Sequence, residues 1–218
     1  KKPRIGVLKQ DLGLDPAVER VYQETQQQLA SLGYEIVEVE LPMLEYVVPV
    51  YYTIATAEAS ANLARFNGVR YGFRPEYAEN PEELVRKARN EGFGDEVKLR
   101  ILLGTYVLRS GFQDEYYIRA QRIRTAIRND FVRCFEEAPL LLTPVTPGLP
   151  YPIGERSSFE QKVEDLFTSA VNLAGIPALS FPAGQEGDLP VGMQLVAPQF
   201  REDLLFSAGR RFERSRSR

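Results

Sequence analysis

Apolar positions along the chain first mark a set of short segments that are typical of β-strands. Runs rich in Val, Ile and Leu, bounded by Pro or Gly, predict strands near residues 4–8, 35–40, 139–143, 178–182 and 191–197. Between the first two strands, apolar residues recur at helical spacing. Strand, helix and strand in succession form a βαβ unit, so at least part of the sheet should be parallel.

Apolar residues at a spacing of three and four predict helices in the rest of the chain. Asp15 and Pro16 give an N-cap and a first-turn signal for the first helix, which Gly33 should end. Ser158 and Gln161 are expected to form a capping box. The remaining helices are expected over residues 47–66, 81–90, 95–109, 113–137, 159–174 and 201–214.

These elements predict an α/β fold in which a mixed β-sheet is covered by helices. We expect a single α/β domain over residues 1–218, with the helical stretch 47–137 forming an inserted layer or lobe beside the sheet. The chain begins with KKPRIGV, without a methionine and directly before a predicted strand, so the domain is expected to be incomplete at its N-terminus. Strands that should meet a missing half would leave apolar surface uncovered.

Composition narrows the classes of function. The chain is 44% hydrophobic and 26% charged, with a net charge of −3 and a pI near 5.3, which argues against broad nucleic-acid binding. No apolar run reaches the length of about 18 residues that a membrane span needs. A single cysteine excludes an internal disulfide framework and fits a reducing compartment, so we expect a cytoplasmic protein.

The chain shows no catalytic machinery of its own. It contains no histidine, which excludes Ser-His-Asp and Cys-His arrangements and the usual zinc sites within it. It has no phosphate-binding glycine loop and no G-x-S-x-G elbow. Cys134 lies on the apolar stripe of its predicted helix and is expected to be buried and inert. We therefore expect no catalytic residue and no metal or cofactor in this chain.

Arg100 does not fit its surroundings in the sequence. It lies in EVKLRILLGT, a predicted helix whose apolar residues suggest burial in a core. A guanidinium there either covers apolar neighbours while its head stays in water, or it meets an anion. The pattern alone favours the first interpretation.

Four blocks of the sequence resemble the amidase signature family. They are VPVYYTIATAEASANLARFNGVRYG, the stretch from GFGDEVKLRILLGTYVL to RIRTAI, LLLTPVTP, and NLAGIPALSFPAG with LPVGMQLVAP. The first two are most similar to the A subunits of the glutamyl-tRNA(Gln)/aspartyl-tRNA(Asn) amidotransferases. The resemblance covers the C-terminal half of such a subunit. Leu99 stands where the family usually has a second arginine.

The resemblance implies both an activity and a division of roles. In this family a serine nucleophile hydrolyses glutamine, and the ammonia passes to a partner subunit that amidates an activated glutamyl- or aspartyl-tRNA. The catalytic Lys, cis-Ser and Ser nucleophile lie in the half that this chain does not match. By resemblance, Arg100 binds the α-carboxylate of glutamine, Asp165 binds its α-ammonium group, and Tyr51 contacts the substrate. The other subunits of the complex would be of the B and C types, ATP and Mg would be used by the partner subunit, and tRNA would be contacted only indirectly.

Two alternatives to this function remain open. The chain could belong to another amidase signature hydrolase, although a neutral amide would need neither Arg100 nor Asp165. It could also be a non-catalytic module that binds an amino acid. At the level of single residues, Asp165 could form a surface ion pair, and either Tyr51 or Tyr52 could face the substrate.

Overall fold

The computed structural model describes residues 2–156, 161 and 163–216, and the chain divides into two compact units. The first, which we call the sheet unit, comprises Lys1–Val48 and Ile123–Arg218. The second, the helical unit, comprises Pro49–Arg122. The capping residue predicted at Ser158 lies outside the described residues.

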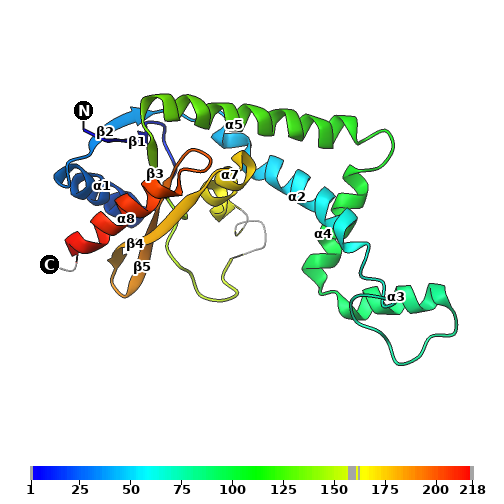
Figure 1. Ribbon diagram of the computed structural model, residues 1–218. Helices are drawn as coiled ribbons and strands as arrows, with labels where there is room; N and C mark the ends of the chain where they lie inside the picture. Colours follow the sequence, from blue (N-terminus) through cyan, green and yellow to red (C-terminus); the bar gives the residue numbers. More distant parts are fainter. Residues whose placement is uncertain (1, 157–160, 162, 217–218) are drawn as a thin grey trace. The chain divides into compact units, whose positions relative to one another are not determined.

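The sheet unit contains a mixed five-stranded sheet, which confirms the predicted fold class (Figure 1). Its strand order is β2-β1-β3-β5-β4. Strand β1 pairs in parallel with β2 and β3, whereas β5 pairs antiparallel with β3 and β4. The strands are β1 (Arg4–Leu8), β2 (Glu35–Val39), β3 (Leu140–Pro144), β4 (Ala178–Glu186) and β5 (Leu189–Val196). All five lie where the apolar pattern places them, and β4 extends four residues further into a hairpin.

Two helices pack on one face of the sheet. Helix α1 (Pro16–Ser31) and helix α8 (Glu202–Arg216) bury their apolar stripes against side chains of β1, β3 and β5. As expected, Asp15 caps α1, where its carboxylate accepts a hydrogen bond from the backbone of Ala17. This face holds the main core, which includes Ile5, Val18, Val21, Leu29, Leu142, Met193, Leu195, Ala208 and Phe212.

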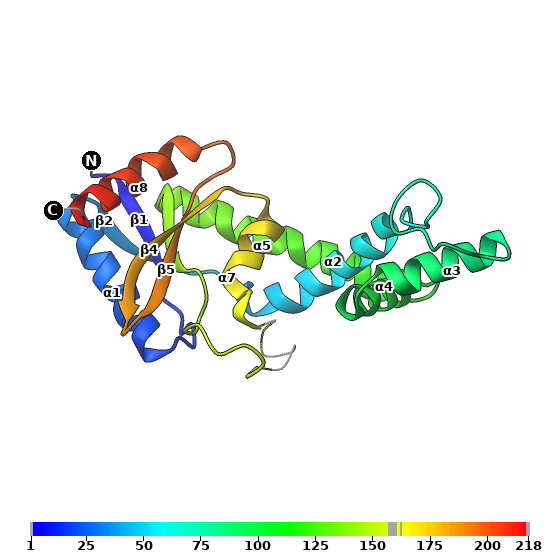
Figure 2. The same ribbon diagram turned by 90° about the horizontal axis from the view of Figure 1, so that it is seen from below.

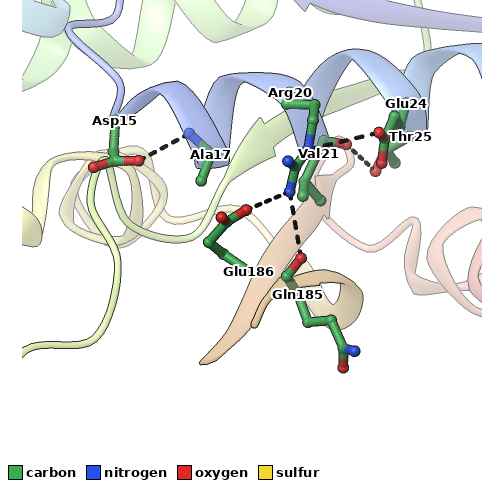
Figure 3. Close-up of polar contacts among 8 residues, drawn as sticks. All are labelled: Asp15, Ala17, Arg20, Val21, Glu24, Thr25, Gln185 and Glu186. Atoms are coloured by element: carbon green, nitrogen blue, oxygen red, sulfur yellow. Dashed lines mark hydrogen bonds and ion pairs between the residues drawn. The ribbon is translucent and has the colours of Figure 1, made fainter. Parts of the chain in front are cut away.

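An arginine ties α1 to the end of the β4–β5 hairpin (Figure 3). The guanidinium of Arg20 donates a 2.6 Å hydrogen bond to Glu186 and a longer one to the carbonyl of Gln185. A bulge near Gly184 lets the strand approach the helix closely, because a Cβ at this position would lie 2.8 Å from Val21. The hairpin is thus held against α1 by the close backbone approach at Gly184 and by the ion pair between Arg20 and Glu186.

The opposite face of the sheet is covered by residues 123–137 of α5 and by α7 (Leu166–Ala174) (Figure 2). The buried carboxylate of Asp130 accepts a 2.8 Å hydrogen bond from the backbone of Met43 and pairs with Arg133. Edge strand β4 is less covered on this face, where Ala178, Ser180 and Pro182 are exposed. Gly175 ends α7 with a positive φ.

The helical unit contains most of α2 (Val47–Leu63), which a short 3₁₀ turn, η1 (Leu44–Tyr46), precedes. It also contains α3 (Pro81–Gly92), α4 (Asp95–Val107), η2 (Asp114–Ile118) and the first residues of α5 (Arg119–Glu137). One continuous α-helix was expected over 113–137, but η2 is a π-helical segment. Tyr116, within this segment, is exposed and packs beside Tyr106 and Phe112.

Candidate substrate-binding site

The cluster that carries Arg100 is built on two helices of the helical unit, α2 and α4. They approach each other closely at Gly104, where a Cβ would lie only 2.0 Å from the carbonyl oxygen of Thr56. One residue further along, the hydroxyls of Ser60 and Thr105 share a 3.0 Å hydrogen bond. A glycine is therefore required for this approach, and the approach places Arg100 next to the tyrosines of α2.

The guanidinium of Arg100 is held from two sides. Its Nε donates a 3.0 Å hydrogen bond to Glu96, one turn earlier on α4, and its Cζ lies 5.8 Å from the ring centre of Tyr52. The Tyr51 ring meets the Tyr52 ring edge to face, with centroids 5.3 Å apart. The hydrogen bond to Glu96 is the main cause that raises the pKa of Arg100, against a smaller effect of burial, so the group stays charged.

The expectation that α4 is a buried core helix is wrong. Its apolar side chains at helical spacing are largely exposed, with 68% of Leu102 accessible, and the exposed set is Leu99, Leu102, Leu103 and Tyr106. Within this helix only Gly104 is fully buried. Helix α4 packs one narrow face against α2 at Gly104, and no described part of the helical unit covers the opposite face.

Asp165 occupies a different position from the one expected. The helix predicted over 159–174 is interrupted there, and Asp165 takes the N-cap position of α7. Its side chain is exposed and makes no capping hydrogen bond, whereas its carbonyl oxygen accepts one from the backbone of Ser169. A carboxylate at the start of a helix, next to backbone N–H groups, is electrostatically favourable.

The structure brings Tyr51 and Arg100 together in the helical unit, while Asp165 belongs to the sheet unit. Because these are separate units, the pairing of Arg100 and Asp165 on one substrate remains a prediction. The choice between the two tyrosines also remains a prediction. The guanidinium faces Tyr52 directly, and Tyr51 supports the Tyr52 ring.

Sequence reasoning missed two polar partners in this unit. Glu96 precedes Arg100 by four residues, a spacing that would have predicted an ion pair on a helix. Glu58 of α2 accepts a 2.6 Å hydrogen bond from the Tyr117 hydroxyl, which comes from the π-helical segment. No local sequence signal predicts this second contact, because it joins residues that are far apart in the chain.

Other candidate chemistry is sparse in the part of the chain that the structure describes. Cys134 is buried, as expected, and burial raises the pKa of its thiol to about 11. Among the described residues, no group of three His, Cys, Asp or Glu side chains could hold a metal ion. No described helix combines the length and apolar character that crossing a membrane requires.

Comparison with known proteins gives a consistent result. The amidase family model matches residues 1–206. Among curated relatives, a glutamyl-tRNA(Gln) amidotransferase A subunit of Clostridium acetobutylicum, the one numbered 2, is 46% identical over 99% of this chain. The A subunit of the glutamyl-tRNA(Gln) amidotransferase of Geobacter metallireducens is 48% identical over 93% of this chain.

Solved structures agree at the level of the fold. A crystal structure of the glutamyl-tRNA(Gln) amidotransferase A subunit from Thermotoga maritima matches 94% of this chain and 40% of its own, with a TM-score of 0.69 and 29% identity. A crystal structure of an amidase matches 99% of this chain and 46% of its own, with a TM-score of 0.75 and 24% identity.

The chain matches only part of each relative's length. This chain covers 46% of the Clostridium relative and 42% of the Geobacter relative, so it spans about half the length of each. The family match itself extends over nearly the whole of this chain. The chain therefore belongs to the amidase family.

Proposed function

We propose that this chain is the substrate-recognising part of a glutamine-hydrolysing, ammonia-supplying subunit of a tRNA-dependent amidotransferase. The complex would convert Glu-tRNA(Gln) or Asp-tRNA(Asn) to the amide form. The observation that carries the proposal is the identity of 46–48% with proteins named as A subunits of glutamyl-tRNA(Gln) amidotransferases, over 93–99% of this chain. Another amidase is the alternative, but a structure of that kind, a 6-aminohexanoate cyclic dimer hydrolase, shares only 22% identity.

The chemistry of glutamine supports the same proposal. Free glutamine is a zwitterion, so a site that selects it needs a cation for the carboxylate and an anion for the ammonium group. Arg100 supplies a planar cation that pairs well with a carboxylate. Asp165, exposed and without a capping contact, would supply the anion, and Tyr51 a hydroxyl group. A neutral amide would use neither charge.

The rest of the reaction would require groups outside this chain. By resemblance, the Lys, cis-Ser and nucleophilic Ser belong to the half of the relatives that it does not match. We expect partner subunits of the B and C types, with ATP and Mg used by the partner subunit of the complex. We also expect this chain to contact tRNA only indirectly and the complex to act in the cytoplasm as a carbon–nitrogen ligase. The isolated chain should release no ammonia from glutamine.

A chimera tests this proposal. This chain would replace the matching region of the Clostridium acetobutylicum relative, and ammonia release from glutamine would be measured with the partner subunits present. The chimera should be active, and Arg100→Ala should lower kcat/KM for glutamine at least tenfold, because a charge-assisted contact is worth about 1.5–3 kcal/mol. Asp165→Asn should lower it in the same way.

Exposed Arg109, two residues after the end of α4, provides the matched control. Arg109→Ala removes an arginine from the same part of the unit and should leave kcat/KM unchanged. Thermal midpoints of all variants should stay close to that of the parent, since Arg100 is not part of a core. A chimera that hydrolyses glutamine normally after Arg100→Ala would show that this arginine is structural.

A further inference from the structure

Glu96 is the residue that fixes one edge of the Arg100 guanidinium. Its Oε1 lies 3.0 Å from Nε of Arg100, and the Tyr52 ring lies 5.8 Å from Cζ of the same group. Tyr51 braces that ring edge to face at 88°. A long arginine side chain usually samples many rotamers, but these contacts restrict both the plane and the rotation of this one.

The donors that remain are those that suit a carboxylate. Among the described residues, Glu96 is the only acceptor of a hydrogen bond from Arg100, and it uses Nε alone. No other described residue accepts a hydrogen bond from the two Nη groups at the end of the guanidinium. Two parallel N–H groups match the two oxygens of a carboxylate in a bidentate pair.

We propose that Glu96 is a positioning residue: it holds Arg100 by Nε so that the Nη1–Nη2 edge is presented to the α-carboxylate of the substrate. This inference rests on the proposed function, in which Arg100 binds that carboxylate. The proposal adds Glu96 to the site and gives a reason for the ion pair between Arg100 and an acidic residue of the same helix. Because the donors are already oriented, less side-chain conformational entropy is lost when the substrate binds.

A role in stability alone does not account for this pair. Both side chains are more than a third exposed, and an exposed pair four residues apart on a helix changes the unfolding equilibrium by only about twofold. The other alternative is that Glu96 competes with the substrate carboxylate for Arg100. If Glu96 merely occupied Arg100, its removal would free the guanidinium and tighten substrate binding, whereas loss of a positioning residue weakens it.

The test measures binding to the full chain by isothermal titration calorimetry with two probes. L-Glutamine carries the α-carboxylate, and L-glutaminamide replaces it with a neutral amide. The chain should prefer glutamine, and Glu96→Ala should weaken glutamine binding by about three- to tenfold while leaving glutaminamide unchanged. Glu96→Gln keeps an oxygen that accepts from Nε, so it should bind glutamine within about twofold of the parent. A general structural defect would weaken both probes equally.

Asp95 offers the matched control. It lies on the first turn of α4 and pairs with Lys98 at 3.8 Å, without contact to Arg100. Asp95→Ala should leave the preference for glutamine intact. Tighter or unchanged glutamine binding by Glu96→Ala would overturn the positioning role.

Arg100→Ala separates failure of this inference from failure of the proposed function. If the parent shows no preference for glutamine, or Arg100→Ala keeps the preference, the carboxylate role of Arg100 is wrong and the inference fails with it. If Arg100→Ala loses the preference but Glu96→Ala keeps it, only the positioning role is wrong.

Discussion

The two units of this chain use apolar residues in opposite ways. In the sheet unit, strands and helices enclose side chains such as Ile5, Leu142 and Phe212 almost completely. In the helical unit, the described buried hydrophobic residues are few and mostly small: Val50, Ile54, Ala57, Ala88 and Ala120. Large exposed ones are Val69, Tyr71, Phe73, Tyr77, Leu99, Leu102, Leu103, Tyr106 and Tyr116. The sheet unit is thus stabilised by core burial, whereas the helical unit depends on backbone fit and helix caps.

Truncating leucines in the two units should give the largest contrast. Leu142 is fully buried in β3, so Leu142→Ala removes core contacts and leaves a cavity, which costs about 2–5 kcal/mol. Leu102 is 68% exposed on α4, so Leu102→Ala should change the free energy of unfolding by less than about 0.5 kcal/mol. Urea unfolding followed by circular dichroism measures both. A large loss for Leu102→Ala would show that another surface covers α4.

Gly104 tests the claim that backbone fit holds the helical unit. An Ala at this position would place a Cβ 2.0 Å from the Thr56 carbonyl oxygen, so α2 and α4 would have to separate. We expect Gly104→Ala to destabilise by about 1–3 kcal/mol, despite the better helix propensity of Ala. Hydrogen exchange read by mass spectrometry should quicken in α2 and α4 and stay unchanged in β1 and β3.

Gly94 gives the comparison for this change. It lies at the N-cap of α4, and a Cβ at this position would meet no described atom within 4 Å. Gly94→Ala should therefore cost less than about 1 kcal/mol, through the cap alone. Equal effects at the two glycines would contradict the close-packing argument.

The sheet was predictable from the sequence because its central strands are buried. Leu140, Leu141 and Leu142 form a short continuous apolar run, which is typical of a strand that is buried on both faces. Their order in the sheet was not predictable, since it depends on pairing between segments far apart in the chain. The extension of β4 beyond its predicted end follows from the hairpin with β5, which the short apolar pattern did not reveal.

The candidate site was predictable only in part. The resemblance identified Arg100, and a helix was expected around it, but the apolar pattern gave the wrong environment. An apolar stripe shows that a helix can be covered, not that it is. Tyr52 became a neighbour of Arg100 only through the packing of α2 on α4 at Gly104, and Asp165 reached an N-cap position because the predicted helix is interrupted.

In the helical unit, loss of a helix cap should matter more than truncation of the exposed Leu102. Asn80 caps α3, where its side chain accepts a 2.8 Å hydrogen bond from the backbone of Glu83. Asn80→Ala should destabilise α3 by about 1 kcal/mol, detected as faster amide exchange in its first turn. Exposed Asn90 on the same helix is the control, and Asn90→Ala should be neutral or slightly stabilising. Matching losses at the two positions would contradict the cap.

The smallest effect we expect is a pH dependence at the same cap. The carboxylate of Glu83 accepts a 2.7 Å hydrogen bond from the backbone N–H of Glu79 and pairs with Lys87 at 3.1 Å. The backbone hydrogen bond, followed by Lys87, lowers the pKa of Glu83 below its usual value of 4.5. A carboxyl whose pKa is lower in the folded state stabilises that state above its unfolded pKa, and the contribution is lost as pH falls through the folded value.

Helix α3 should therefore loosen slightly below pH 4.5 in the parent, as seen in the Cα chemical shifts of its first turn across a pH titration. Glu83→Gln keeps an acceptor but cannot titrate, so the pH-dependent part of the change should disappear from α3. The sheet unit serves as the internal reference, because this cap belongs to the helical unit. An identical pH response in the parent and in Glu83→Gln would assign the loosening to another carboxyl group and remove Glu83 from the features that hold the helical unit together.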